Sequence, residues 1–189
     1  SLFLFDIQEE QFGELKAFAK KNDIPLKNLS PMIRARITHI NGSPFERDTD
    51  TESYQTREQE RDRNFRNRGV NLTFSSDTNQ AETIVDGEQF NLSQSHDKGQ
   101  LSIEERYARR LGIKLGDEIQ FDILGVEIIG RVVNLRKVRW TSFVPNFFIK
   151  FAPGLIDDSP KSYVGVIDKV SSDKQFLIQD MIVENFSNI

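Results

Sequence analysis

The chain has 189 residues, with 25 Lys and Arg against 29 Asp and Glu, so its formal net charge is −4. That balance is too weak to predict nucleic acid or an anionic membrane surface as a partner. The absence of cysteine excludes disulfides, zinc–thiolate sites and cysteine nucleophiles. A hydrophobic fraction of 37% suffices for a core, and no apolar run approaches the roughly 18 residues of a membrane span. The length predicts one domain or two small lobes.

The first part of the chain alternates strand, helix and strand. Residues 2–7 form an apolar run that predicts a buried strand, and residues 9–21 carry apolar side chains at helical spacing. Pro25 and Pro31 bracket a connection that we expect to be rich in turns. Alternation over 32–40 then predicts a second strand. This β-α-β opening indicates an α/β layer.

The most polar segment is 46–68, in which 13 of the 23 residues are charged. Acids concentrate at its start and arginines at its end, and opposite charges recur three or four residues apart. This spacing predicts a solvated helix over about 55–66. The arginine end could bind phosphate or a lipid head group, or the segment could be an exposed excursion between strands. The sequence leaves both readings open.

From residue 70 the pattern changes to short strands separated by Gly, Asn and Asp. Residues 70–74 and 82–85 are strand candidates. A short helix is predicted over 104–111, because acids occupy its first turn and arginines its last, which suits the helix dipole. Gly112 is placed to end that helix.

The remaining elements return to mixed character. Residues 118–124 and 126–133 predict a tight hairpin, and 147–151 and 163–167 predict two further strands. A final helix begins after Ser171 or Ser172. Its predicted apolar face consists of Phe176, Leu177, Ile178 and Met181.

Together these elements predict an α+β fold. We expect an α/β lobe made of 1–74 and 141–189, with 46–68 as its exposed charged excursion. A small β-rich lobe, 75–140, interrupts it.

No catalytic arrangement is recognisable. His39 shares a strand face with apolar residues, and His96 lies between a Ser and an Asp that are too close in sequence to converge as a triad. The chain contains no nucleophile elbow, zinc-protease motif or phosphate-binding loop. The sequence therefore predicts a protein that is not an enzyme and binds no cofactor or metal, and a hydrolase is the least favoured class.

Two segments are more informative. Residues 111–121 combine two glycines with a following alternating strand, a pattern typical of a helix, a turn and a barrel strand. Residues 135–154 are basic and aromatic and cross from one predicted lobe to the other. That crossing is either a hinge whose aromatics fill the inter-lobe core or an apolar cleft for a lipid or partner chain. Its candidate contact residues are Arg139, Trp140, Phe143, Pro145, Asn146, Phe147 and Phe148.

Four stretches, 2–8, 71–74, 102–121 and 135–154, resemble the large extracytoplasmic domain of bacterial FtsX-like ABC transporter permeases, in particular the YbbP-like group. Trp140 followed by Pro145, Asn146 and two phenylalanines is the most specific element. One departure is that Gly87 is followed by Glu-Gln-Phe, where family members tend to carry a Trp.

The resemblance implies a porter-like α/β lobe interrupted by a small β lobe, as in MacB-type periplasmic cores. It implies a non-catalytic domain on the periplasmic side of the bacterial inner membrane, between membrane spans absent from this chain. Such a domain transmits the motion driven by a separate cytoplasmic ATPase subunit, and so exports or extracts lipid-like, lipoprotein or hydrophobic cargo or drives a periplasmic partner such as a hydrolase. The start at Ser1, directly before an apolar strand, agrees with a part of a longer protein.

One alternative stays open from the residues themselves. The chain could be a soluble binding module that holds a small apolar ligand in a cleft between the lobes, lined by Trp140, Phe143, Phe147 and Phe148.

Overall fold

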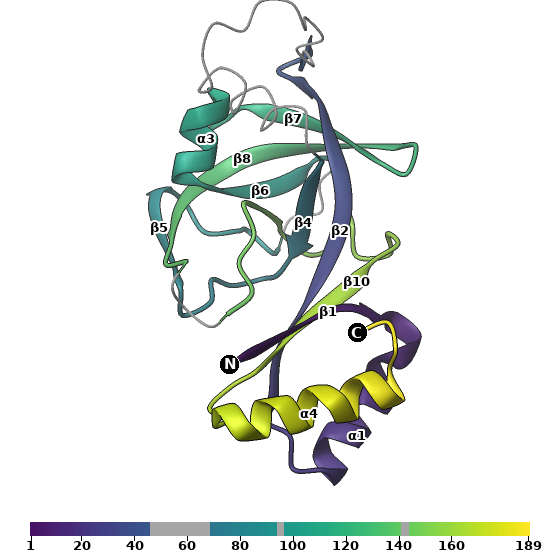
Figure 1. Ribbon diagram of the computed structural model, residues 1–189. Helices are drawn as coiled ribbons and strands as arrows, with labels where there is room; N and C mark the ends of the chain where they lie inside the picture. The colour runs from purple at the N-terminus through teal and green to yellow at the C-terminus, as the bar shows by residue number, and fades with distance from the viewer. Residues whose placement is uncertain (46–68, 94–96, 141–143) are drawn as a thin grey trace, which may run out of the picture. The chain divides into compact units, whose positions relative to one another are not determined.

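The computed structural model describes residues 1–45, 69–93, 97–140 and 144–189. The predicted charged helix within 46–68, His96 and Phe143 lie outside the described residues. In the described part the fold is mixed α/β and mostly strand, which confirms the predicted class at that level (Figure 1). Its strands are β1 (Leu2–Gln8), β2 (Leu26–Ile40), β3 (Ser43–Pro44), β4 (Val70–Phe74), β5 (Glu82–Gly87), β6 (Gly99–Glu104), β7 (Glu118–Ile123), β8 (Val126–Val138), β9 (Ile149–Phe151) and β10 (Ser162–Ile167). Its helices are η1 (Glu9–Gln11), α1 (Phe12–Lys21), α3 (Glu105–Leu111) and α4 (Ser172–Asn185).

The chain divides into two compact units. Unit 1 comprises Ser1–Ile33, Arg139–Asn146 and Pro160–Ile189, and unit 2 comprises Arg34–Val138 and Phe147–Ser159. The predicted lobes, 1–74 with 141–189 and 75–140, divide the sequence at other positions and stay a prediction.

Unit 1 is a three-stranded antiparallel sheet covered by two helices. Strand β10 lies between β1 and the first part of β2, with Leu4 opposite Gly165 and Val164 opposite Ser30. Helices α1 and α4 lie beside β1 (Figure 1) and share one apolar core with it. Within this core Phe18 meets Phe186 edge-on at 5.5 Å between ring centroids. This core includes Leu4, Ile7, Leu15, Ala19, Ile167, Ile178 and Ile182.

The prediction of a turn-rich connection up to Pro31 was wrong, because β2 already begins at Leu26. Pro31 lies within this strand opposite Tyr163 of β10. Proline lacks the N–H that a central strand uses for pairing, which is why it indicated a turn. The antiparallel pairing of β2 with β10 from Leu26 to Met32 nevertheless holds this stretch extended.

The predicted apolar face of the final helix was right for Ile178 but wrong for Phe176 and Leu177. Phe176 and Leu177 are 70% and 60% exposed, and the buried positions of α4 are Ile178 and Ile182. Residues four apart lie on one face of a helix, whereas Phe176 and Leu177 lie about 200° and 100° around the axis from Ile178. Because three apolar residues, 176–178, are adjacent here, the periodicity alone did not select the buried pair.

Six strands of unit 2 pair into a closed barrel. The order β2-β4-β9-β6-β8 continues through β7, which pairs with both β8 and β2. Two of these pairs, β4 with β9 and β6 with β8, are parallel. The interior is apolar, and Phe121 contacts Phe151 edge-on at 5.5 Å. Its side chains that are fully buried include Leu72, Leu101, Ile103, Ile119, Phe121, Ile149 and Phe151.

Helix α3 begins and ends close to where the sequence predicts. The Glu104 carboxylate accepts a hydrogen bond from the Tyr107 N–H at 2.7 Å, which satisfies one free donor of the first turn. Gly112 ends the helix with φ of 72°, a left-handed conformation that glycine adopts without steric cost. The predicted hairpin is β7 and β8, and β8 extends beyond the predicted end to Val138.

The observed face of α4 can be tested with two alanine substitutions. Ile182→Ala should lower the free energy of unfolding by about 2–5 kcal/mol, because it leaves a cavity in the core of unit 1. Phe176→Ala should change it by less than about 0.5 kcal/mol, because that ring is exposed. Urea denaturation followed by circular dichroism measures both. Equal losses would contradict the observed face.

Candidate functional site

Unit 2 contains a buried guanidinium that links several strands. Arg136 lies opposite Glu104 in the β6–β8 register, on the side of the sheet away from the apolar barrel interior, and its own exposure is 0%. Its Nη1 donates to the backbone oxygen of Ser102 at 2.5 Å and to the Ser102 hydroxyl at 3.2 Å. Its Nη2 donates to the backbone oxygen of Phe147. Strand β8 is therefore tied to β6 and to the residues that lead into β9.

A second buried cation, Lys150, shares a counter-charge with Arg136. The Glu82 carboxylate pairs with the Lys150 ammonium and lies 3.7 Å from Nε of Arg136. Lys150 also donates to the backbone oxygen of Asp77 at 3.0 Å, and Glu82 accepts from the Asn79 amide at 2.9 Å. This arrangement, called here the Glu82 network, satisfies most of the polar atoms that the barrel buries.

Burial shifts the pKa of both cations in the Glu82 network. Loss of hydration lowers the pKa of Arg136 to about 10, against the opposing effects of Glu82 and Glu104. Burial also lowers the pKa of Lys150, and Glu82 opposes that shift through its charge and its hydrogen bond. Arg136 therefore stays charged at neutral pH. A void of about 40 Å³ beside Lys150 has room for a water molecule.

The predicted contact residues fall in different environments. Trp140 is 45% exposed and Arg139 is exposed, whereas Pro145 and Phe147 are buried. The Asn146 amide donates to the backbone oxygen of Val144 at 2.9 Å. Phe148 stacks on Tyr107 with ring centroids 4.6 Å apart. The structure describes no position for Phe143, and a role of these residues in contacting cargo or a partner stays a prediction.

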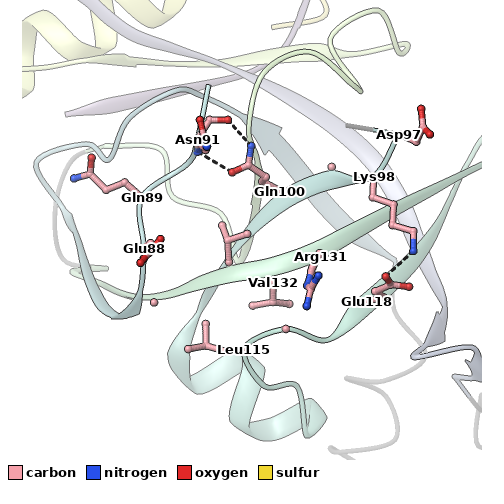
Figure 2. Close-up of a pocket in the computed structure, with 14 residues that line it drawn as sticks. Glu88, Gln89, Asn91, Asp97, Lys98, Gln100, Leu115, Glu118, Arg131 and Val132 are labelled. Atoms are coloured by element: carbon pink, nitrogen blue, oxygen red, sulfur yellow. Dashed lines mark hydrogen bonds and ion pairs between the residues drawn. The ribbon is translucent and has the colours of Figure 1, made fainter. Parts of the chain in front are cut away.

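Unit 2 also carries an open cavity of about 780 Å³, which falls in the range of small-molecule sites (Figure 2). The cavity is lined by the β5–β6 connection, the start of β7 and the middle of β8. Its lining residues are Gly87, Glu88, Gln89, Asn91, Asp97, Lys98, Gly99, Gln100, Leu115, Gly116, Glu118, Arg131, Val132 and Val133.

Polar side chains organise this cavity. Lys98 pairs with Glu118 at 2.6 Å, and the Gln100 side chain binds both the N–H and the backbone oxygen of Asn91 at 2.8 Å (Figure 2). Arg131 lies opposite Glu118 in the β7–β8 register, and its guanidinium makes no ion pair within the described residues. The cavity therefore combines charged side chains of both signs, Arg131 with Glu88 and Asp97, with an apolar wall of Leu115 and Val132.

The turn before β7 forms one wall of the cavity, and the sequence predicts that turn. The Asp117 carboxylate accepts from the N–H of Lys114 at 2.8 Å and from the Asn41 amide at 3.0 Å. Gly116 has φ of 83° and donates its N–H to the backbone oxygen of Val132 at 2.8 Å. The opposite wall, formed by residues of 87–91 and 97–100, carries no motif that the sequence reveals.

The described residues contain no group of three His, Asp or Glu side chains that could hold a metal ion. His39 is half-buried, and its Nδ1 lies 3.0 Å from the Thr38 hydroxyl. Within that same part of the chain, no helix is both long and apolar enough to cross a membrane.

Comparison with known proteins finds a relative among ABC transporter permeases. The chain is 35% identical over 162 residues to the ABC transporter permease YbbP of Escherichia coli strain K12, which is described as uncharacterized. The match includes 86% of this chain and 18% of the relative. The chain is therefore homologous to a part of the permease, and that part is less than a fifth of the permease's length.

A crystallised domain is described as part of a permease from Porphyromonas gingivalis. The alignment covers 88% of the present chain and 74% of the crystallised domain. Its TM-score is 0.34 at 10% identity, too low to support any argument. No protein-family model matches the chain.

The Glu82 network can be tested by removing its carboxylate charge. Glu82→Gln keeps the side-chain shape but leaves Lys150 and Arg136 buried without their counter-charge. We expect the free energy of unfolding to fall by about 3–5 kcal/mol, measured by urea denaturation. The control, Glu88→Gln, changes an exposed carboxylate and should shift stability by less than about 0.5 kcal/mol. If the two variants unfold at the same urea concentration, the network does not stabilise the barrel.

Proposed function

We propose that this chain is the extracytoplasmic domain of an FtsX-like ABC transporter permease, on the periplasmic side of the bacterial inner membrane. It couples ATP hydrolysis by a separate cytoplasmic subunit to the export or extraction of lipid-like or hydrophobic cargo, or to the action of a periplasmic partner. The observation that carries the proposal is the 35% identity to a permease across 86% of the chain.

The role proposed for the chain is mechanical rather than catalytic. Its sequence contains no phosphate-binding loop, so ATP would be bound by the partner subunit. Its titratable cluster in the barrel is buried and internally paired, an arrangement suited to holding strands together. The proposed architecture is a porter-like lobe interrupted by a β-rich lobe, as in MacB-type periplasmic cores.

The basic-aromatic segment, 135–154, contains exposed residues and buried residues, and we expect them to have different roles. Arg139 and Trp140 are exposed and would contact cargo or a partner. Pro145 and Phe147 are buried, so their part would be to pack and orient the segment. Phe148, which is 37% exposed and stacked on Tyr107, would present the exposed part of its ring.

The periplasmic location can be tested by cysteine labelling in the full-length permease, with any cysteine outside this domain replaced. Val126→Cys introduces a thiol at a position that is 59% exposed in the β7–β8 hairpin. A maleimide that cannot cross the inner membrane should label it in intact spheroplasts. The nearby Ile123→Cys, at 3% exposure, is the control and should react only after denaturation. Labelling of Val126→Cys only after lysis would place the domain on the cytoplasmic side.

Coupling can be tested with one exposed aromatic residue. In proteoliposomes that hold the permease and its ATPase subunit, Trp140→Ala should reduce release of a fluorescent lipid on the order of 10-fold, because exposed aromatics dominate contact surfaces. ATP turnover should persist. Leu124→Ala, at a position that is 78% exposed in the β7–β8 turn, should leave release unchanged. Equal release by both variants would exclude Trp140 from the contact surface.

A further inference from the structure

Unit 1 carries a groove separate from the cavity of unit 2. It lies between α1 and the start of β2 and has a volume of about 490 Å³, within the range of small-molecule sites. It is lined by Phe12, Lys16, Ala19, Lys20, Ile24, Leu26, Lys27 and Leu29. Five of these eight side chains are apolar and three are lysines.

The floor of the groove is continuous with the core of unit 1. Ala19 and Ile24 are buried in that core, and Leu26 and Leu29 pack against it while remaining half-buried. Gly165 of β10 makes this packing possible, because a Cβ there would lie 3.0 Å from Leu29 Cδ2 and 3.2 Å from Leu26 Cδ1. The two leucines can therefore lie flat on the sheet, and their outer surface faces the groove.

The rim of the groove is cationic. Lys16 and Lys20 lie one turn apart on α1, and Lys27 is on β2. In the part of the chain that the structure describes, none of their ammonium groups makes an ion pair within 4.0 Å. Lys16 lies 4.2 Å from the centroid of the Phe12 ring, a cation–π contact that leaves its charge uncompensated. Like charges one turn apart on a helix repel each other weakly, and an anion bound between them would relieve that repulsion.

Asp168 is a carboxylate close enough to Lys27 to affect its charge balance. The pKa of Asp168 is lowered chiefly by the hydrogen bond from the Ser1 hydroxyl, and Lys27 contributes only a small part. Asp168 lies outside the lining of the groove and already accepts hydrogen bonds from Ser1 and from the Lys169 N–H. It therefore does not neutralise the three lysines.

We propose that this groove binds a single-chain amphiphile with an anionic head group, either a carboxylate or a phosphate. The acyl chain lies along the leucine floor, and the head group lies among Lys16, Lys20 and Lys27. A groove of finite volume fits one dispersed chain better than a bilayer surface, which would require a broad exposed apolar face. The inference rests on the proposed function only for the source of the lipid, since binding by this chain alone needs no transport.

Binding can be measured by NMR on the ¹⁵N-labelled 189-residue chain. Laurate and dodecyl phosphate are added below their critical micelle concentrations. Both should cause saturable amide shifts concentrated at 12–29. Dodecyltrimethylammonium, with the same chain and the opposite charge, should bind at least about 10-fold more weakly. Acetate and inorganic phosphate should show no saturable binding, because they lack the chain that the floor accepts.

Matched lysine variants separate the groove from general surface charge. The triple variant Lys16→Gln, Lys20→Gln, Lys27→Gln should weaken laurate binding on the order of 10-fold. A control triple variant, Lys21→Gln, Lys169→Gln, Lys174→Gln, has the same net charge and changes exposed lysines of unit 1 outside the groove. It should bind laurate like the original chain, and circular dichroism confirms that both variants are folded.

Three results would overturn the proposal. The first is equal affinity for the cationic and anionic amphiphiles, and the second is equal loss of binding in the two triple variants. The third is binding to phosphatidylglycerol vesicles in flotation without binding of dispersed laurate or dodecyl phosphate, which would indicate a membrane surface instead. Failure here leaves the cysteine-labelling result unaffected, so this inference and the permease proposal can fail separately.

Discussion

Unit 2 depends on the complete burial of one guanidinium. Arg136 can be 0% exposed only because backbone oxygens of two other segments accept its hydrogen bonds and Glu82 supplies a counter-charge. A buried arginine without such partners would carry a desolvation penalty of several kcal/mol. The strands that flank β8 must therefore be in register before the charge can be accommodated. This requirement favours one arrangement of the barrel over other pairings of the same short strands.

Charges elsewhere in the molecule contrast with the Glu82 network. Within the barrel, the cationic groups share Glu82 and are removed from water. At the two concave surfaces, Arg131 in unit 2 and three lysines in unit 1 remain without ion pairs among the described residues. Paired interior charge holds the scaffold, whereas unpaired surface charge beside apolar walls is available to a ligand.

The basic-aromatic segment, 135–154, is evident in the sequence, but the burial of its individual residues is not. Arg136 belongs to that segment, and basic residues are almost never fully buried, so its position in the barrel could not be expected. Trp140 is exposed, while Phe147 and Pro145 are buried. The groove in unit 1 escaped notice for another reason. In the sequence, Lys16, Lys20 and Lys27 look like ordinary solvated charges. Only the packing of α1 beside the start of β2 brings them to the rim of one groove.

By itself, the sequence determined the local features: an α+β composition, helix α3 with its glycine stop, the β7–β8 hairpin and the turn at Gly116. These depend on spacing and turn chemistry within a few residues of one another. Only the tertiary structure decided which apolar residues of α4 are buried, that β2 continues through Pro31, and that Arg136, Glu82 and Lys150 meet. Each of these outcomes depends on a neighbour distant in sequence: the core shared with α1, the pairing with β10, and the closure of the barrel.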